Sequence, residues 1–112
     1  VDDEKKVDMA TALSGSGPAY VFLVMEAMVD AGVAIGLTRA QATELVQQTV
    51  LGSAAYARQS DWSLADLRAM VTSPAGTTAA GLLAMERGAL RATIIDGVRA
   101  AHARAIELGE GS

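Results

Sequence analysis

The sequence predicts an all-α fold of about five helices, and three observations support this prediction. Apolar residues make up 51% of the 112-residue chain and aromatic residues only 4%, so Ala, Leu, Val, Ile and Met must fill the core. Apolar side chains recur at helical spacing in segments that Gly, Pro, Ser and Thr separate. No segment shows the convincing alternation of a strand. Small and aliphatic side chains suit helices that pack closely.

Composition and charge exclude several classes of protein. The net charge is −4 and the sequence pI is about 4.8, so no basic face is available for nucleic acid. The chain has no cysteine and one histidine, which excludes a disulfide scaffold and leaves no metal site. The most apolar segment, 18–35, contains Glu26 and Asp30. We therefore expect no membrane span and a cytoplasmic location.

The first predicted helix runs from about Pro18 to Ala34. Proline suits a first helical turn because its missing N–H is not needed there. The apolar residues of this helix surround almost its whole circumference, which is typical of a helix buried on all sides. The mean hydropathy of +0.28 is high for a small domain. We therefore expect a central helix that a second copy or another domain covers.

The second helix is predicted to begin after Thr38 and to continue to about Gln59. Thr38 and Gln41 have the Thr-x-x-Gln spacing of a capping box. Gly52 lies inside this helix, where glycine costs ~1 kcal/mol relative to alanine. We expect a close helix crossing at Gly52.

Three further punctuated segments predict the remaining helices. Ser63 caps the third helix, which ends before the Ser73–Pro74 pair because the residue before proline disfavours the helical region. The fourth helix is predicted at about 77–87 and is ended by Gly88. The fifth is predicted at about 90–108.

Two stretches rich in glycine, serine and threonine are candidates for chemistry. They span 11–18 and 72–78, and each ends where a helix is predicted to begin. The free amides at a helix start can hold a carboxylate or a phosphate. The alternative is that each stretch is a capped turn without a ligand. Neither stretch is a dinucleotide fingerprint or a phosphate-binding P-loop.

Three motifs carry a resemblance to a known family. They are LSGSGPAY at 13–20, VTSPAGTT at 71–78 and GLLAME at 81–86. In this order and spacing they resemble the C-terminal domain of pyrroline-5-carboxylate reductases. The resemblance extends from about Val7 to Leu108.

The resemblance implies a reaction and an organisation. Members of this family use NADPH or NADH to reduce 1-pyrroline-5-carboxylate to L-proline, the last step of proline biosynthesis. An N-terminal Rossmann domain binds the dinucleotide, and the helical domain forms an intertwined homodimer that can assemble further. Residues 1–12 would then be the entry segment from a missing Rossmann domain, 13–109 the dimerisation and substrate domain, and 110–112 a tail. The chain alone would be inactive.

The resemblance also assigns residues. Thr11 matches a catalytic threonine whose hydroxyl lies near the substrate's ring nitrogen. Met70 and Val71 match positions that pack near the nicotinamide. The loop that holds the substrate carboxylate is matched by Ser73, Gly76, Thr77 and Thr78.

Two positions depart from the family pattern. The loop commonly reads Ser-Pro-Gly-Gly, and Ala75 replaces its first glycine here. A left-handed backbone at that position would strain alanine. Some members carry glutamate where this chain has Asp61, whose side chain is shorter.

Two other functions are compatible with parts of the sequence. A non-catalytic helical dimerisation module would tolerate loss of the Thr78 hydroxyl, apart from ~1 kcal/mol of helix capping. A helical domain of another Rossmann-partnered dehydrogenase, such as a β-hydroxyacid dehydrogenase, would typically carry a catalytic lysine on a helix. The only lysines here are Lys5 and Lys6, in the polar N-terminal segment, which disfavours that class.

Overall fold

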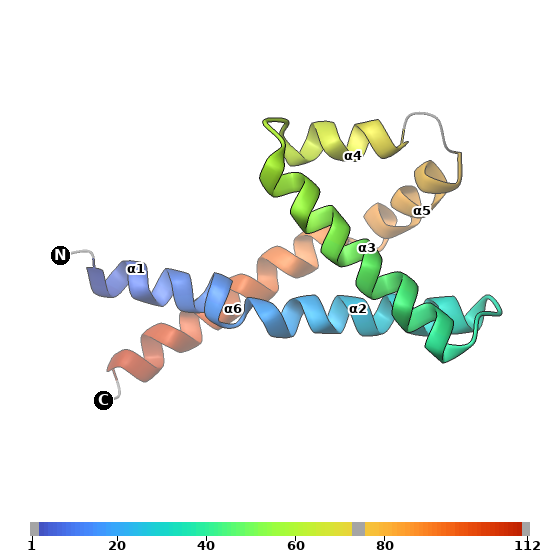
Figure 1. Ribbon diagram of the computed structural model, residues 1–112. Coiled ribbons are helices and arrows are strands. Elements are labelled where there is room, and N and C mark those ends of the chain that lie inside the picture. Colours follow the sequence, from blue (N-terminus) through green and yellow to red (C-terminus); the bar gives the residue numbers. More distant parts are fainter. Residues whose placement is uncertain (1–2, 73–75, 111–112) are drawn as a thin grey trace. The chain divides into compact units, whose positions relative to one another are not determined.

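Helices make up most of the part of the protein that its computed structural model describes, residues 3–72 and 76–110. No strand occurs within these ranges, which confirms the all-α prediction. The elements, shown in Figure 1, are six α-helices and one π-helical turn: α1 (Asp3–Ala10), η1 (Thr11–Gly15), α2 (Gly17–Ala34), α3 (Arg39–Gln59), α4 (Leu64–Thr72), α5 (Gly76–Arg87) and α6 (Leu90–Glu110).

No helix was predicted before Pro18, and a turn was expected at 14–17, whereas α1 leads through η1 into α2. Asp3 and Glu4 lie in the first turn of α1. Acidic side chains stabilise a helix there, because they are close to the positive end of its dipole. Apolar periodicity gave no signal because α1 is a polar helix with no buried residue.

The chain divides into two compact units. The terminal unit contains the residues up to Val21 and those from Ala84 onward, and the central unit is Phe22–Leu83. In the terminal unit, η1 packs against α6, and α1 also contacts α6. The buried residue of this packing is Ala12.

A glycine ends α2 and reverses the chain into α3. Gly36 has a φ of +118°, a left-handed conformation that glycine adopts without strain. Its N–H donates to the carbonyl of Val33 at 3.1 Å, and the N–H of Leu37 donates to the carbonyl of Gly32 at 3.0 Å. This pair of hydrogen bonds is the Schellman motif, which satisfies the last carbonyls of α2.

The predicted capping box at the start of α3 is confirmed. The Thr38 hydroxyl accepts the N–H of Gln41 at 3.1 Å, and the Gln41 side chain accepts the N–H of Thr38 at 3.0 Å. Each bond satisfies an amide that the helix itself cannot. A side-chain cap also begins α4, as predicted: the Ser63 hydroxyl accepts the N–H of Asp66 at 3.1 Å.

The close helix approach occurs at Gly32, and the prediction of a crossing at Gly52 was wrong. A Cβ at Gly32 would lie 2.9 Å from the Cβ of Ala42 on α3, closer than two such atoms can pack. A Cβ at Gly52 would meet no atom of the described chain within 4 Å. Ala42 and Val46, on the α3 side of this approach, are the buried residues of the central unit.

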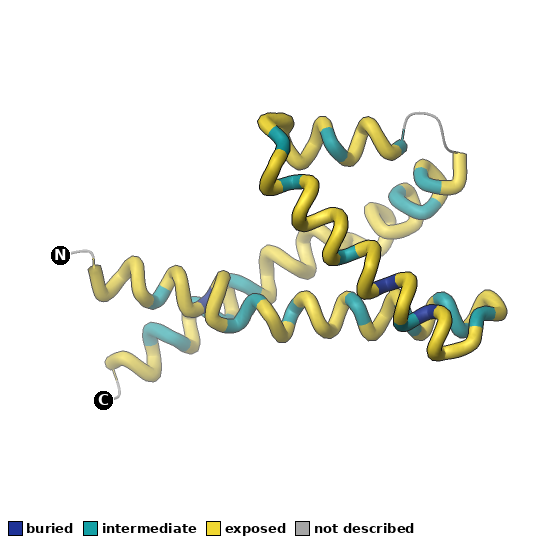
Figure 2. The backbone as a smooth tube through the Cα atoms, in the orientation of Figure 1, coloured by how far each residue is buried: buried dark blue, intermediate teal, exposed yellow. Residues whose placement is uncertain are grey.

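Neither unit has an apolar core of its own. The hydrophobic residues buried in the described ranges are Ala12, Ala42 and Val46, the dark segments of Figure 2. The expected burial of the central helix is not seen in the single chain, because α2 has no buried residue and Leu23 is 66% exposed. Apolar surface on this scale indicates a partner. Other exposed apolar residues of α2 are Val21, Phe22, Val24 and Met28.

One helical run also meets a length and hydropathy criterion for crossing a membrane. It extends over Asp3–Ala34, 32 residues, and none of its most apolar stretch is buried. Glu26 and Asp30 do not prevent the run from meeting this criterion, which the core helix of a soluble protein also meets.

The turn between α5 and α6 places its left-handed residue one position later than the sequence suggested. Gly88 was expected to end the fourth predicted helix, and α5 does end at Arg87. The residue with positive φ, however, is Ala89 at 60°. An L-residue pays roughly 1–2 kcal/mol for this conformation, so the turn is strained at Ala89.

We expect Gly32→Ala to lower the free energy of unfolding by about 1 kcal/mol, because overpacking against Ala42 outweighs the gain in helix propensity. Chemical denaturation measures the change. Gly52→Ala is the matched control, with open space around it, and should raise stability by about 0.5–1 kcal/mol. Equal effects of the two substitutions would contradict the close approach at Gly32.

We expect Ala89→Gly to raise the free energy of unfolding by about 1 kcal/mol, because glycine relieves the positive φ. Thermal unfolding followed by circular dichroism measures the shift. The same exchange at Ala100, inside α6, should instead lower stability by about 1 kcal/mol. A loss of stability at both positions would show that position 89 carries no strain.

Candidate functional site

The start of α5 carries three of the predicted substrate-binding residues. Gly76, Thr77 and Thr78 are its first three residues, so their amides lack acceptors within the helix. Among the turn and cap hydrogen bonds that join described residues, none uses these amides. A Cβ at Gly76 would meet no atom of the described residues within 4 Å, its chain neighbours apart. The helix start can therefore accept a small anion.

The end of α4 carries the two predicted nicotinamide contacts. Met70 is 40% exposed and Val71 is 57% exposed. The Thr72 hydroxyl donates to the carbonyl of Arg68 at 2.6 Å within the helix. Met70 and Val71 thus present apolar surface where the VTSPAGTT motif begins. Ser73, predicted to bind substrate, and Ala75, the departure from the family loop, lie outside the described residues.

Thr11, the predicted catalytic residue, is the first residue of η1 and is exposed. Its carbonyl accepts the N–H of Ser16 at 2.9 Å, which is a bond across five residues. The Ser14 hydroxyl donates to the carbonyl of Ala10 at 3.0 Å. A widened helical turn therefore presents Thr11, where the sequence suggested an irregular turn.

Tyr20 is not among the residues predicted from the sequence to have a function. The Tyr20 hydroxyl donates to the carbonyl of Ala12 at 2.9 Å, in a partly buried hydrogen bond. The sequence contains no signal for this bond, because the two residues are eight positions apart and α-helical neighbours lie three or four apart.

The predicted residues fall into both units. Met70, Val71 and Gly76–Thr78 belong to the central unit, on either side of 73–75, whereas Thr11 belongs to the terminal unit. Asp61, at the other position that departs from the family pattern, is exposed between α3 and α4.

None of the ion pairs in the described chain includes a candidate residue. The ion pairs of the described chain are Asp30–Arg39 at 3.2 Å, Glu86–Arg91 at 2.8 Å and Arg104–Glu107 at 2.9 Å. All three are solvent-exposed, and each contributes little to stability. Within the described ranges no cluster of His, Asp and Glu could hold a metal ion. The polar groups that the described candidate residues themselves offer are backbone amides, carbonyls and hydroxyls.

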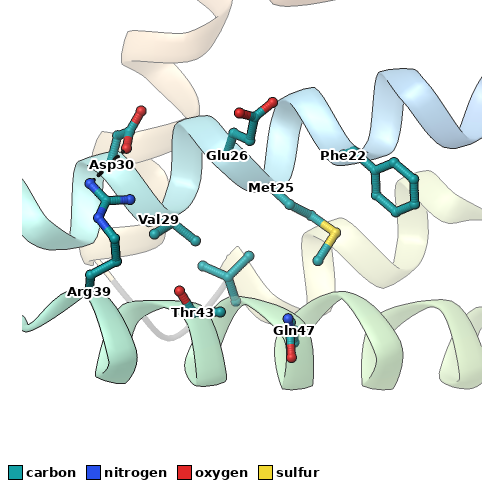
Figure 3. A pocket seen from close by; sticks show the side chains of 9 residues that line it. Phe22, Met25, Glu26, Val29, Asp30, Arg39, Thr43 and Gln47 are labelled. Atoms are coloured by element: carbon teal, nitrogen blue, oxygen red, sulfur yellow. Dashed lines mark hydrogen bonds and ion pairs between the residues drawn. The ribbon is translucent and has the colours of Figure 1, made fainter.

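A groove of about 320 Å³ between α2 and α3 contains none of the predicted residues. Figure 3 shows Met25 and Val29 pointing from α2 toward α3, with the Asp30–Arg39 ion pair at one end. The groove is open and mainly apolar, and it continues the uncovered surface of α2. Its remaining lining residues are Phe22, Glu26, Thr43, Val46 and Gln47.

Fold and exposed surface together define a helical association module, because its apolar helices need a partner. Comparison with known proteins identifies the module. Residues 4–108 match the family described as pyrroline-5-carboxylate reductase dimerisation. The chain belongs to this family.

Individual relatives agree with this assignment. A pyrroline-5-carboxylate reductase of Mycobacterium leprae is 49% identical over 94% of this chain and 42% of its own length. The solved structure of a Plasmodium falciparum pyrroline carboxylate reductase with NADP bound matches with a TM-score of 0.90, at 41% identity over 94% of this chain and 42% of that one.

A pyrroline-5-carboxylate reductase structure from Coxiella burnetii also has a TM-score of 0.90, at 46% identity over 96% of this chain and 40% of that chain. The chain thus spans about two-fifths of the length of the relatives it matches.

Proposed function

We propose that this chain is the dimerisation and substrate-binding domain of a cytoplasmic pyrroline-5-carboxylate reductase. The complete enzyme would reduce 1-pyrroline-5-carboxylate to L-proline with NADPH or NADH. In this proposal 1–12 lead in from a Rossmann domain, 13–109 form the helical domain, and 110–112 are a tail. The family match over 4–108 supports the proposal.

The observation that carries the proposal is the start of α5 at Gly76, inside the VTSPAGTT motif at 71–78. The substrate is a small ring with one carboxylate. Amides at a helix start bind a carboxylate without an arginine, and the absence of a side chain at Gly76 leaves room for close approach. We assign the carboxylate to the amides of Gly76 and Thr77, to the Thr78 hydroxyl and to Ser73.

Thr11 is assigned to the ring nitrogen of the substrate. Reduction of a cyclic imine adds a hydride to the ring carbon and a proton to the nitrogen. A hydroxyl at the nitrogen orients the imine and helps to hold the proton that the nitrogen gains. No covalent nucleophile is needed for this chemistry.

The coenzyme is assigned mainly to the Rossmann domain. The exposed apolar surface of Met70 and Val71 fits a nicotinamide ring, and the sequence of this chain has no dinucleotide fingerprint. When bound, the nicotinamide supplies the hydride. Met70 and Val71 would exclude water from that side of the ring. The isolated chain is expected to bind dinucleotide far more weakly than the complete enzyme.

A homodimer follows from the uncovered apolar surface. The family is a dimerisation family, and α2 exposes large apolar side chains along its length without burying any of its residues. Burying one such side chain contributes roughly 1.5–3 kcal/mol. We therefore propose that a second copy covers α2, so that the helix becomes central only in the dimer. Dimers could assemble further.

The substrate assignment can be tested in a chimera in which this chain replaces the matched segment of the Coxiella burnetii enzyme, which is 46% identical to it. We expect the chimera to oxidise NADPH in the presence of pyrroline-5-carboxylate. Thr78→Ala should raise KM for pyrroline-5-carboxylate about tenfold, because it removes a hydrogen bond to a charged group. Steady-state kinetics with varied substrate measure the change.

Thr49→Ala is the matched control, because its hydroxyl donates to the carbonyl of Leu45 within α3 at 2.7 Å. It should leave KM unchanged. If Thr78→Ala leaves the KM of the chimera unchanged, the result favours the non-catalytic dimerisation module. In that module the substitution costs only ~1 kcal/mol of helix-capping free energy. An inactive chimera would argue against the reductase assignment itself.

The dimer can be tested on the isolated chain by light scattering coupled to gel filtration. We expect the mass of a dimer or of a multiple of it. Leu23→Lys should shift the mass toward the monomer, because it places a charge where the partner would bury an apolar side chain. Glu26→Lys puts the same side chain at an already charged position of α2 and should leave the mass unchanged. A wild-type monomer would contradict the dimer.

A further inference from the structure

The π turn at η1 alters the hydrogen bonds around the proposed catalytic threonine. In an α-helix the N–H of Ser16 would donate to the carbonyl of Ala12, four residues earlier. Here it donates to the carbonyl of Thr11 at 2.9 Å. A π turn inside an α-helix is rare and occurs frequently at functional sites. The widened turn therefore needs other contacts to hold it.

Tyr20 supplies such a contact. Ala12 is only 1% exposed, and a buried carbonyl without a donor costs free energy. The Tyr20 hydroxyl donates to this carbonyl at 2.9 Å. Tyr20 lies on the first turn of α2, so the bond joins the π turn to the helix that follows. In the widened turn the Ala12 carbonyl does not accept the N–H of Ser16, and it accepts the hydroxyl of Tyr20 instead.

The direction of Thr11 depends on the same turn. The Thr11 carbonyl accepts the N–H of Ser16 at 2.9 Å. This hydrogen bond fixes the backbone at Thr11, and the backbone sets the direction in which the Thr11 side chain leaves the helix. Relaxation of η1 to an α-helical turn would remove the hydrogen bond and change that direction.

We infer that Tyr20 is a positioning residue for the reductase reaction: its hydroxyl, bound to the Ala12 carbonyl, keeps η1 widened and so directs the Thr11 hydroxyl toward the substrate's ring nitrogen. The inference rests on the proposed function, since it needs Thr11 to act on substrate. Tyr20 itself need not touch the substrate. Its effect should therefore appear in turnover rather than in substrate binding.

Tyr20→Phe in the chimera tests the inference, because it removes the hydroxyl and keeps the ring. We expect kcat to fall by about 3- to 10-fold, the effect of one hydrogen bond. KM for pyrroline-5-carboxylate should stay within about twofold, because carboxylate binding is left intact. Tyr56→Phe removes the same atom from an exposed tyrosine of α3 and should change neither constant.

A double-variant cycle separates positioning through Thr11 from a general structural role. If Tyr20 acts through Thr11, then Tyr20→Phe should reduce kcat in the parent chimera but not in one that already carries Thr11→Ala. Equal losses in both backgrounds, or no loss in the parent, would overturn the inference. An active chimera that responds to Thr11→Ala but not to Tyr20→Phe would refute the inference and leave the proposed function standing.

A conservative replacement guards against a folding defect. Fluorotyrosine at position 20 keeps both the ring and the hydroxyl, so it should retain kcat within about twofold of the parent. A loss as large as that of Tyr20→Phe would show that packing of the ring, and not the hydrogen bond, is what matters, and would overturn the inference. An inactive chimera would refute the proposed function, and with it the role of Tyr20.

Discussion

The constraint on which the structure depends is an excess of apolar helical surface over what one chain can cover. α2 is apolar around most of its circumference, yet the single chain buries none of its residues. The hydrophobic residues that are buried in the described ranges are two alanines and one valine. Such helices are stable only when another surface removes them from water. This requirement agrees with membership of a dimerisation family.

The sequence was informative wherever a local interaction decides the structure. The capping box at Thr38 and the cap at Ser63 depend on side chains three residues from their partners, and both were predictable. α1 was missed because a polar helix has no apolar periodicity to reveal it. The position of the close helix approach was also missed, since Gly32 and Gly52 look alike until the partner residue, Ala42, is known.

The candidate site also has one part that local sequence predicts and one part that it does not. The helix start at Gly76 follows from its motif, so the amides proposed for the carboxylate could be located from sequence. The π turn that presents Thr11 could not, because it depends on a hydrogen bond between Tyr20 and Ala12, eight residues apart. Both parts rely on backbone groups that the fold holds in place, which suits a reaction whose reactive group belongs to a cofactor.

The π turn also keeps the helices on either side of it in rotational phase. It accommodates one residue more than an α-helical turn within a single turn. A deletion of a single residue between Thr11 and Ser16 would therefore restore an ordinary α-helical turn and leave α1 close to its present rotation. Val7 and Met9 of α1 would still line the groove that they form with Ile106 of α6. The terminal unit should accordingly tolerate such a deletion, whereas the widened turn that presents Thr11 would be lost.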